Sequence, residues 1–66
     1  MKQYMVVDND GGEFVVDAEG PRQAAKQVAT DAAEIEYLYY LDGAEHYALF
    51  DEDGWNYDDL SVTEVE

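Results

Sequence analysis

The sequence predicts an α+β domain in which a mostly antiparallel sheet of about five strands carries one helix across one face. Three Asp-Gly dipeptides, at positions 10–11, 42–43 and 53–54, lie between strand-like segments. Asp-Gly is among the strongest short signals of a hairpin turn. A segment after the first hairpin has small apolar residues at helical spacing instead. The expected element order is β-β-α-β-β-β, in a single domain covering residues 1–66.

The first predicted hairpin joins residues 2–8 to residues 13–18. If Asp10-Gly11 is a two-residue turn, Val7 lies opposite Phe14 and Met5 lies opposite Val16. One face then carries Met5, Val7, Phe14, Val16 and Ala18. The other, more exposed face carries Tyr4, Val6, Val15 and Asp17.

The segment EGPRQAAKQVATDAAE predicts one amphipathic helix of about 13 residues. Pro21 suits the first helical turn, and Gly20 before it is a weak N-cap. The alanine-rich face lets the helix lie close to the sheet, so the bulk of the core must come from the strands. Asp31 and Glu34 fall near the expected C-terminus, where acids oppose the helix macrodipole. We therefore attribute their position to function and not to helix stability.

Three further strands are predicted at residues 35–41, 45–51 and 55–62, joined by the second and third Asp-Gly turns. Their pairing places one set of residues on a common face: Leu38, Tyr40, Tyr47, Leu49, Leu60 and Val62. The opposite face carries Ile35, Tyr37, Tyr39, Leu41, Ala48, Phe50, Trp55 and Tyr57. Both faces are apolar and one helix can cover only one of them. The sequence leaves open which face meets the helix. Either the sheet curls, or aromatics on the second face remain available to a partner or a second copy.

Charge is the strongest compositional signal, with 17 Asp and Glu against 3 Lys and Arg, a formal net charge of -14. The last 40 residues contain 12 acids and no Lys or Arg. Nucleic acid and anionic membranes are disfavoured as ligands because both would be repelled. Apolar content of 47% and aromatic content of 14% nevertheless favour a packed fold over disorder. A strongly basic protein is the favoured partner.

The chain has no cysteine, which favours a reducing compartment. The N-terminal segment MKQYMVVDND has too short an apolar run for a signal peptide or a membrane span. We expect a soluble cytoplasmic protein, in the cytoplasm of the host cell if it is encoded by a phage. At 66 residues its core is small, so its stability is expected to be marginal.

The acidic stretch FDEDGWNYDD, residues 50–59, raises the possibility of a calcium loop. Counted from Asp51, however, glycine falls at the fourth position and Val62 at the twelfth, where an EF-hand requires glycine at the sixth and glutamate at the twelfth. We expect no metal and no cofactor. His46 and Ser61 are the only residues of their types, and so short a chain offers little room for an enclosed pocket. We therefore expect no enzymatic activity.

The acids and aromatics are better suited to a protein interface, where Tyr and Trp act as anchors. Carboxylates two apart on a strand lie roughly 6.6 Å apart, near the phosphate spacing of an extended single strand. Asp51 with Asp53, or Glu34 with Glu36, could supply such a row. The predicted partner-binding residues are Asp31, Glu34, Glu36, Asp51, Glu52, Asp53, Trp55, Tyr57, Asp58 and Asp59.

In size, acidity and lack of cysteine, and in acidic-aromatic stretches such as DEDGWNYDD, the chain resembles small phage-encoded nucleic-acid mimics of the anti-CRISPR type. The resemblance covers overall character across the whole chain and involves no shared motif. It implies an inhibitor that binds the basic nucleic-acid-binding groove of a CRISPR effector subunit and blocks target DNA binding. Carboxylates would stand where phosphates normally bind.

Two alternatives share the same composition. A small domain adapted to high salt also replaces Lys by Asp and Glu over its whole surface, with no partner implied. An antitoxin-like module that neutralises a basic protein has the same electrostatics and a different target. The requirement for molar salt in folding distinguishes the first alternative from a binding role.

Overall fold

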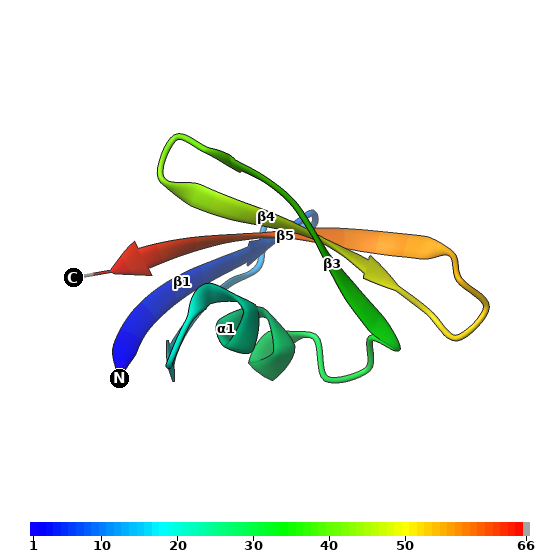
Figure 1. The fold of residues 1–66 in the computed structure, drawn as a ribbon, viewed down its shortest axis with the longest axis horizontal. Coiled ribbons are helices and arrows are strands. Elements are labelled where there is room, and N and C mark those ends of the chain that lie inside the picture. The colour runs from blue at the N-terminus through cyan, green and yellow to red at the C-terminus, as the bar shows by residue number, and fades with distance from the viewer. Residues whose placement is uncertain (66) are drawn as a thin grey trace.

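In the computed structural model, which describes residues 1–65, five antiparallel strands form one sheet and a single helix packs on one side of it (Figure 1). The elements are β1 (Lys2–Asp8), β2 (Glu13–Ala18), α1 (Pro21–Val28), β3 (Glu34–Leu41), β4 (Ala44–Phe50) and β5 (Asn56–Val65). The spatial strand order is β2-β1-β5-β4-β3. The predicted α+β class, element order and three hairpins are confirmed.

The first hairpin has a three-residue loop, so its predicted register is wrong by one residue. The N–H of Gly11 donates to the Asp8 carbonyl at 3.1 Å, and the N–H of Asp8 donates to the Gly12 carbonyl at 3.0 Å. Gly11 alone has a positive φ, of 86°, which is typical of a turn followed by a one-residue bulge. The extra residue exchanges the two faces of β1: Tyr4 and Val6 lie in the core, and Met5 and Val7 lie on the opposite side.

Helix α1 has 8 residues, Pro21–Val28, and is shorter than the 13 expected. Gly20 is its N-cap and Pro21 occupies the first turn, as predicted. The helix ends because Ala29 leaves helical geometry, with φ −96° and ψ 61°. The N–H of Ala33 then donates to the Phe50 carbonyl at 2.9 Å, which ties the chain to β4 instead of extending the helix.

Because the helix ends at Val28, the prediction that Asp31 and Glu34 oppose its macrodipole is wrong. Asp31 lies in the turn after the helix and Glu34 begins β3, so neither acid is part of α1. Lys26 lies in the last turn, where a cation is favourable. The positions of Asp31 and Glu34 therefore cost the helix nothing.

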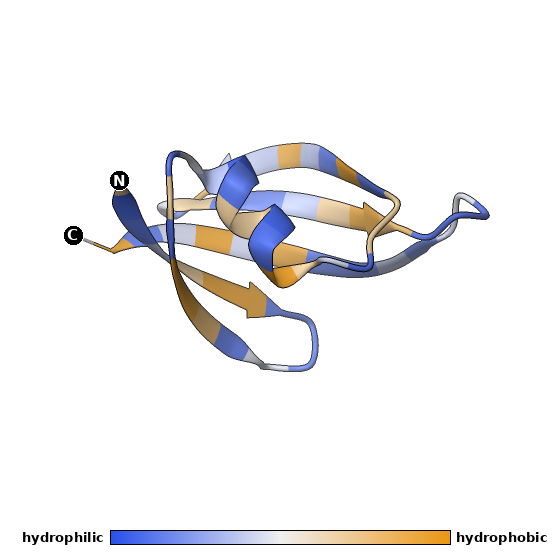
Figure 2. Cartoon of the chain, turned by 90° about the horizontal axis from the view of Figure 1, so that it is seen from below, coloured by the Kyte–Doolittle hydropathy of each residue, from blue (hydrophilic) through white to orange (hydrophobic). Residues whose placement is uncertain are grey.

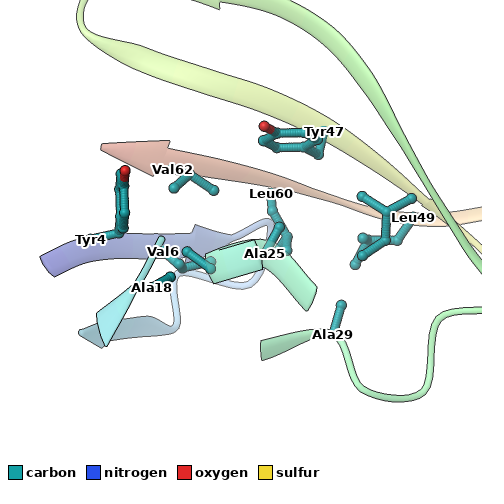
Figure 3. Close-up of a cluster of buried hydrophobic side chains, with 11 residues drawn as sticks. Tyr4, Val6, Ala18, Ala25, Ala29, Tyr47, Leu49, Leu60 and Val62 are labelled. Carbon is teal, nitrogen blue, oxygen red and sulfur yellow. The ribbon is translucent and has the colours of Figure 1, made fainter. Parts of the chain in front are cut away.

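The core lies between α1 and the sheet (Figure 3). The helix and its C-cap contribute small side chains, Ala24, Ala25 and Ala29, and the sheet supplies the bulk, as the alanine-rich pattern predicted. Val6 and Val62 are the largest fully buried side chains. The sheet residues in this core are Tyr4, Val6, Ala18, Ile35, Tyr47, Leu49, Leu60 and Val62.

In the part of the sheet formed by β3, β4 and β5, one face meets the helix. It contains Tyr47, Leu49, Leu60 and Val62. Ile35 and Tyr37 join this face opposite Leu49 and Tyr47, contrary to prediction. The reason is a register shift between Tyr37 and Tyr39, which inserts Leu38 as an extra residue in β3. Beyond the shift, Tyr40 pairs with Glu45 and Tyr39 with His46, so the faces alternate as predicted from Tyr39 onward.

The second face of the sheet carries Met5, Val7, Val15, Tyr39, Leu41, His46 and Phe50. The helix lies on the other side, in front of the strands in Figure 2. Within residues 1–65, no helix is long and apolar enough to cross a membrane.

Candidate protein-binding surface

Eleven carboxylates gather at one end of the sheet, which we call the acidic end. It is formed by the β1–β2 turn, the segment that enters β3, and the β4–β5 turn with the start of β5. The entry to β3 and the β4–β5 turn lie at the right of Figure 1, and the β1–β2 turn lies nearer the middle, beside the part of β5 that pairs with Asp8. Pairing brings these segments together, because Glu34 lies opposite Phe50 and Asp8 lies opposite Leu60. Residues 8–13, 30–36 and 50–59 contain no Lys, Arg or His. Their acids are Asp8, Asp10, Glu13, Asp31, Glu34, Glu36, Asp51, Glu52, Asp53, Asp58 and Asp59.

Two of these acids hold the turns in shape. The Asp51 Oδ1 atom accepts hydrogen bonds from the N–H groups of Asp53, at 3.0 Å, and Trp55, at 2.9 Å. Asp8 Oδ1 does the same for Asp10, at 3.0 Å, and Gly12, at 2.7 Å. A carboxylate that satisfies two backbone donors stabilises the loop around it.

The first and third Asp-Gly turns therefore share one design, Asp-x-Asp-Gly, with a glycine at positive φ in a three-residue loop. Gly54, with φ 86°, is the counterpart of Gly11. The middle turn differs, because Asp42 and Gly43 both have positive φ, at 53° and 85°, as in a type I′ turn. Only this middle turn is the two-residue type that the sequence predicted.

Asp58 and Asp59 point to opposite faces of β5. Asp58 Oδ1 accepts from the N–H of Asn9, at 3.3 Å, and from the N–H of Asp59, at 2.8 Å, and so links the start of β5 to the β1–β2 turn. Asp59 pairs with Ala48 on the face away from the helix, and the Asn56 amide donates to its Oδ1 at 3.3 Å. Both side chains are half-buried.

Tyr57 joins the start of β5 to the segment after the helix. Its hydroxyl donates to Asp31 Oδ1 at 3.1 Å. Tyr57 lines a shallow pocket with Val28 and Leu60, so it lies on the helix side and not on the predicted opposite face. Desolvation of the phenol, then the hydrogen bond to Asp31 and the negative charge of Asp31 and its acidic neighbours, raise the pKa of Tyr57. The phenol is therefore neutral and acts as a hydrogen-bond donor near pH 7.

The remaining predicted acids are exposed, and their side chains accept no hydrogen bond recorded within residues 1–65. They are Glu34, Glu36, Glu52 and Asp53. Glu34 shares a shallow pocket with Arg22 and Lys26, which partly offset its charge. Glu36, Glu52 and Asp53 form no ion pair within 4.0 Å among the described residues.

Trp55 has 73% of its surface exposed and closes the β4–β5 turn, whereas the sequence placed it inside a strand. An indole this exposed adds nothing to the core and leaves its apolar surface free for a partner. It stands directly beside the exposed acids of the same turn. This juxtaposition of charge and an aromatic ring is typical of an interface anchor.

The ten predicted residues are thus brought to one end, but they do not form one uniform surface. Asp51 and Asp53 do not make a strand row, because both lie in or beside the turn and Asp51 holds it. Glu34 and Glu36 do lie two apart on β3. Sequence reasoning missed Asp10 in the β1–β2 turn and Glu13 at the start of β2, which are exposed at the same end. The repeated Asp-x-Asp-Gly pattern was the signal that could have grouped the two turns.

Little charge compensation exists elsewhere. Across residues 1–65 the one ion pair within 4.0 Å joins Lys2 and Glu64 at 3.8 Å, away from the acidic end. No group of three potential metal ligands in the described part of the chain is placed to hold a metal ion.

Comparisons of the chain with models of protein families, with curated proteins and with solved structures found no match.

Proposed function

We propose that this protein is an acidic mimic of DNA or RNA that inhibits a basic nucleic-acid-binding protein by occupying its groove. The observation that carries the proposal is the acidic end: eleven carboxylates from three separate segments meet there without one Lys, Arg or His in those segments. An ordinary surface mixes both signs, because a field of one sign destabilises the folded state. A basic groove would relieve that repulsion on binding.

The specific target we propose is the nucleic-acid groove of a CRISPR effector subunit, in the host cytoplasm. The small, cysteine-free acidic fold is suited to stoichiometric inhibition, which needs no catalytic group. Exposed carboxylates of Glu36, Glu52 and Asp53 would face Arg and Lys side chains that otherwise bind phosphates. Trp55 would provide apolar contact beside them.

Electrostatics should govern this binding. The groove of a nucleic-acid-binding protein and the acidic end each hold counterions, and their release would favour association at low salt. The half-buried Asp8, Asp51 and Asp58 contribute to the field, but the Oδ1 atom of each already accepts hydrogen bonds from backbone N–H groups. We therefore assign direct contact to the exposed acids and a supporting role to the half-buried ones.

The test is competition. The protein is titrated into purified CRISPR effector complexes, and binding of labelled target DNA is measured at several salt concentrations between about 0.05 and 0.5 M. We expect stoichiometric loss of DNA binding at low salt that weakens as salt rises. Unimpaired DNA binding by every effector tested at low salt would contradict the CRISPR target.

The two alternatives give different results in companion experiments. A salt-adapted domain would unfold near 0.1 M salt, whereas the proposed inhibitor stays folded there. An antitoxin-like module would capture a basic protein of another kind from a lysate and leave effector binding to DNA intact. Either result would replace the proposed function.

A further inference from the structure

The two edges of the sheet are unlike each other. At the β2 edge, Glu13 and Asp17 provide charge, and α1 packs against the strand. At the β3 edge, five consecutive large side chains are exposed and none is charged. We call these five residues the aromatic edge: Tyr37, Leu38, Tyr39, Tyr40 and Leu41.

The aromatic edge also offers backbone hydrogen-bonding groups. In a two-residue hairpin the residues that flank the turn, here Leu41 and Ala44, exchange hydrogen bonds. The next pair, Tyr40 with Glu45, is then of the non-hydrogen-bonded kind, so the N–H and C=O of Tyr40 point away from β4. Natural edges are usually protected by Lys, Pro, charge or a bulge. Here only the shift at Leu38 serves that purpose.

We propose that the aromatic edge pairs with the same edge of a second copy of this chain, forming an antiparallel two-fold dimer. In such a dimer Tyr40 lies opposite Tyr40 of the other copy, and the two residues exchange two backbone hydrogen bonds. Tyr39 then lies opposite Leu41 of the other copy. Two five-stranded sheets become one continuous sheet of both chains.

The charge distribution favours the antiparallel over the parallel orientation of the two copies. β3 runs from Glu34 and Glu36 at the acidic end to the uncharged aromatic edge. Pairing centred on Tyr40 leaves the two Glu34 residues twelve residue steps apart, which at roughly 3.3 Å per step is about 40 Å. That distance is several times the Debye length of about 10 Å at 0.1 M salt. A parallel pairing would instead bring the two acidic ends together.

The contact is small, so the dimer is expected to be weak. Each aromatic side chain buries about 150–250 Å² when fully covered. The half-exposed residues of this edge therefore supply several hundred Å² per copy, below the roughly 800 Å² per partner of a standard interface. Salt should strengthen the dimer, because each chain carries a net charge of -14 that opposes association.

Sedimentation equilibrium from about 10 µM to 1 mM, at about 0.05 and 0.5 M NaCl, tests the proposal. We expect a concentration-dependent dimer that tightens with salt, and amide exchange in β3 that slows with concentration while exchange in β2 does not. Tyr40→Glu should weaken dimerisation at least about tenfold, since like charges would meet at the two-fold axis. Val15→Glu is the matched control, because Val15 is similarly exposed on the other edge.

Orientation is tested with a spin label on Glu34→Cys, which is the only thiol because the chain has no cysteine of its own. An interspin distance of about 40 Å is expected for the antiparallel pairing. A monomer at 1 mM in high salt, a dimer equally sensitive to both substitutions, or a short interspin distance would overturn the proposal. If Tyr40→Glu does not fold, amide exchange in the unsubstituted chain and the interspin distance in Glu34→Cys still show whether the dimer forms through β3. This inference does not depend on the proposed function, since partner binding weakens with salt and the dimer strengthens.

Discussion

The two ends of β3 differ in charge and in exposed apolar surface. One end begins with Glu34 and Glu36 and belongs to the acidic end; the other finishes in the uncharged aromatic edge. Charge and apolar surface are therefore segregated along one strand. The -14 charge is therefore concentrated at one end of β3 and is not spread evenly over the surface.

A second difference lies within the acidic end itself. Asp8 and Asp51 each accept two backbone hydrogen bonds and fix the loops, whereas Glu52 and Asp53 accept none recorded within residues 1–65. The first pair serves the fold, and the second pair is available to a partner. Substitutions should separate these two roles.

The largest effect on stability is expected from Asp51→Ala. It removes the acceptor for the N–H groups of Asp53 and Trp55 and should lower the free energy of unfolding by about 2 kcal/mol. Asp51→Asn keeps an acceptor oxygen and should cost less than half as much. Urea denaturation at pH 7 measures both. Equal losses for the two substitutions would show that the hydrogen bonds do not hold the turn.

A smaller effect is expected from Tyr57→Phe, which removes the hydrogen bond to Asp31. At pH 7 the free energy of unfolding should fall by about 0.5–1 kcal/mol. The raised pKa of Tyr57 means that the folded state holds the phenol proton more tightly than the unfolded state, whose pKa is 10.0. Its contribution is present below pH 10 and is lost as pH rises through the folded-state pKa.

Tyr37 and Tyr47 also have raised pKa values, mainly through desolvation, with the charge of Glu45 adding to it. Wild-type stability should therefore decrease above about pH 10, and Tyr57→Phe should decrease less steeply. Urea midpoints at about pH 7 and pH 11 test this comparison. Parallel pH profiles for the two proteins would contradict the assigned role of Tyr57.

The smallest effect on stability is expected from the double substitution Glu52→Gln and Asp53→Asn. The side chains of these exposed acids form no hydrogen bond or ion pair recorded in the described residues. Their neutralisation lessens the repulsion between neighbouring carboxylates. The urea midpoint should stay unchanged or rise slightly, by a few tenths of a kcal/mol in unfolding free energy at most. A loss comparable to that of Asp51→Ala would mean that these acids serve the fold after all.

The fold could be predicted because the turn residues and the apolar spacing agree. Asp-Gly dipeptides located all three hairpins, and Pro21 after Gly20 located the helix start. Details of register could not be predicted, because Asp-Gly fits both a two-residue turn and a three-residue loop with glycine last. That one-residue difference exchanged Met5 and Val7 for Tyr4 and Val6 in the core.

The residue at which the helix ends and the full set of acids at the acidic end could not be predicted from the sequence either. No glycine or proline marks the end after Val28, and the chain leaves the helix through the tertiary hydrogen bond from Ala33 to Phe50. The bulge at Leu38 likewise has no local signal. The ten predicted binding residues reach one end because the hairpins were correctly located, but the roles of Asp51 and Asp58 in holding backbone N–H groups depend on three-dimensional contacts.

A matched pair of triple substitutions tests whether the acidic end is the binding surface. Each set neutralises three acids, so each changes the net charge equally, from -14 to -11. One set, Glu36→Gln, Glu52→Gln and Asp53→Asn, lies at the acidic end; the other, Asp17→Asn, Glu19→Gln and Asp42→Asn, lies elsewhere on the exposed surface. Calorimetric titration into a nucleic-acid-free CRISPR effector complex compares them at about 0.1 M salt. The acidic-end set should weaken binding by about 100-fold and the other set by less than about threefold. Equal weakening by both sets would contradict a localised acidic interface.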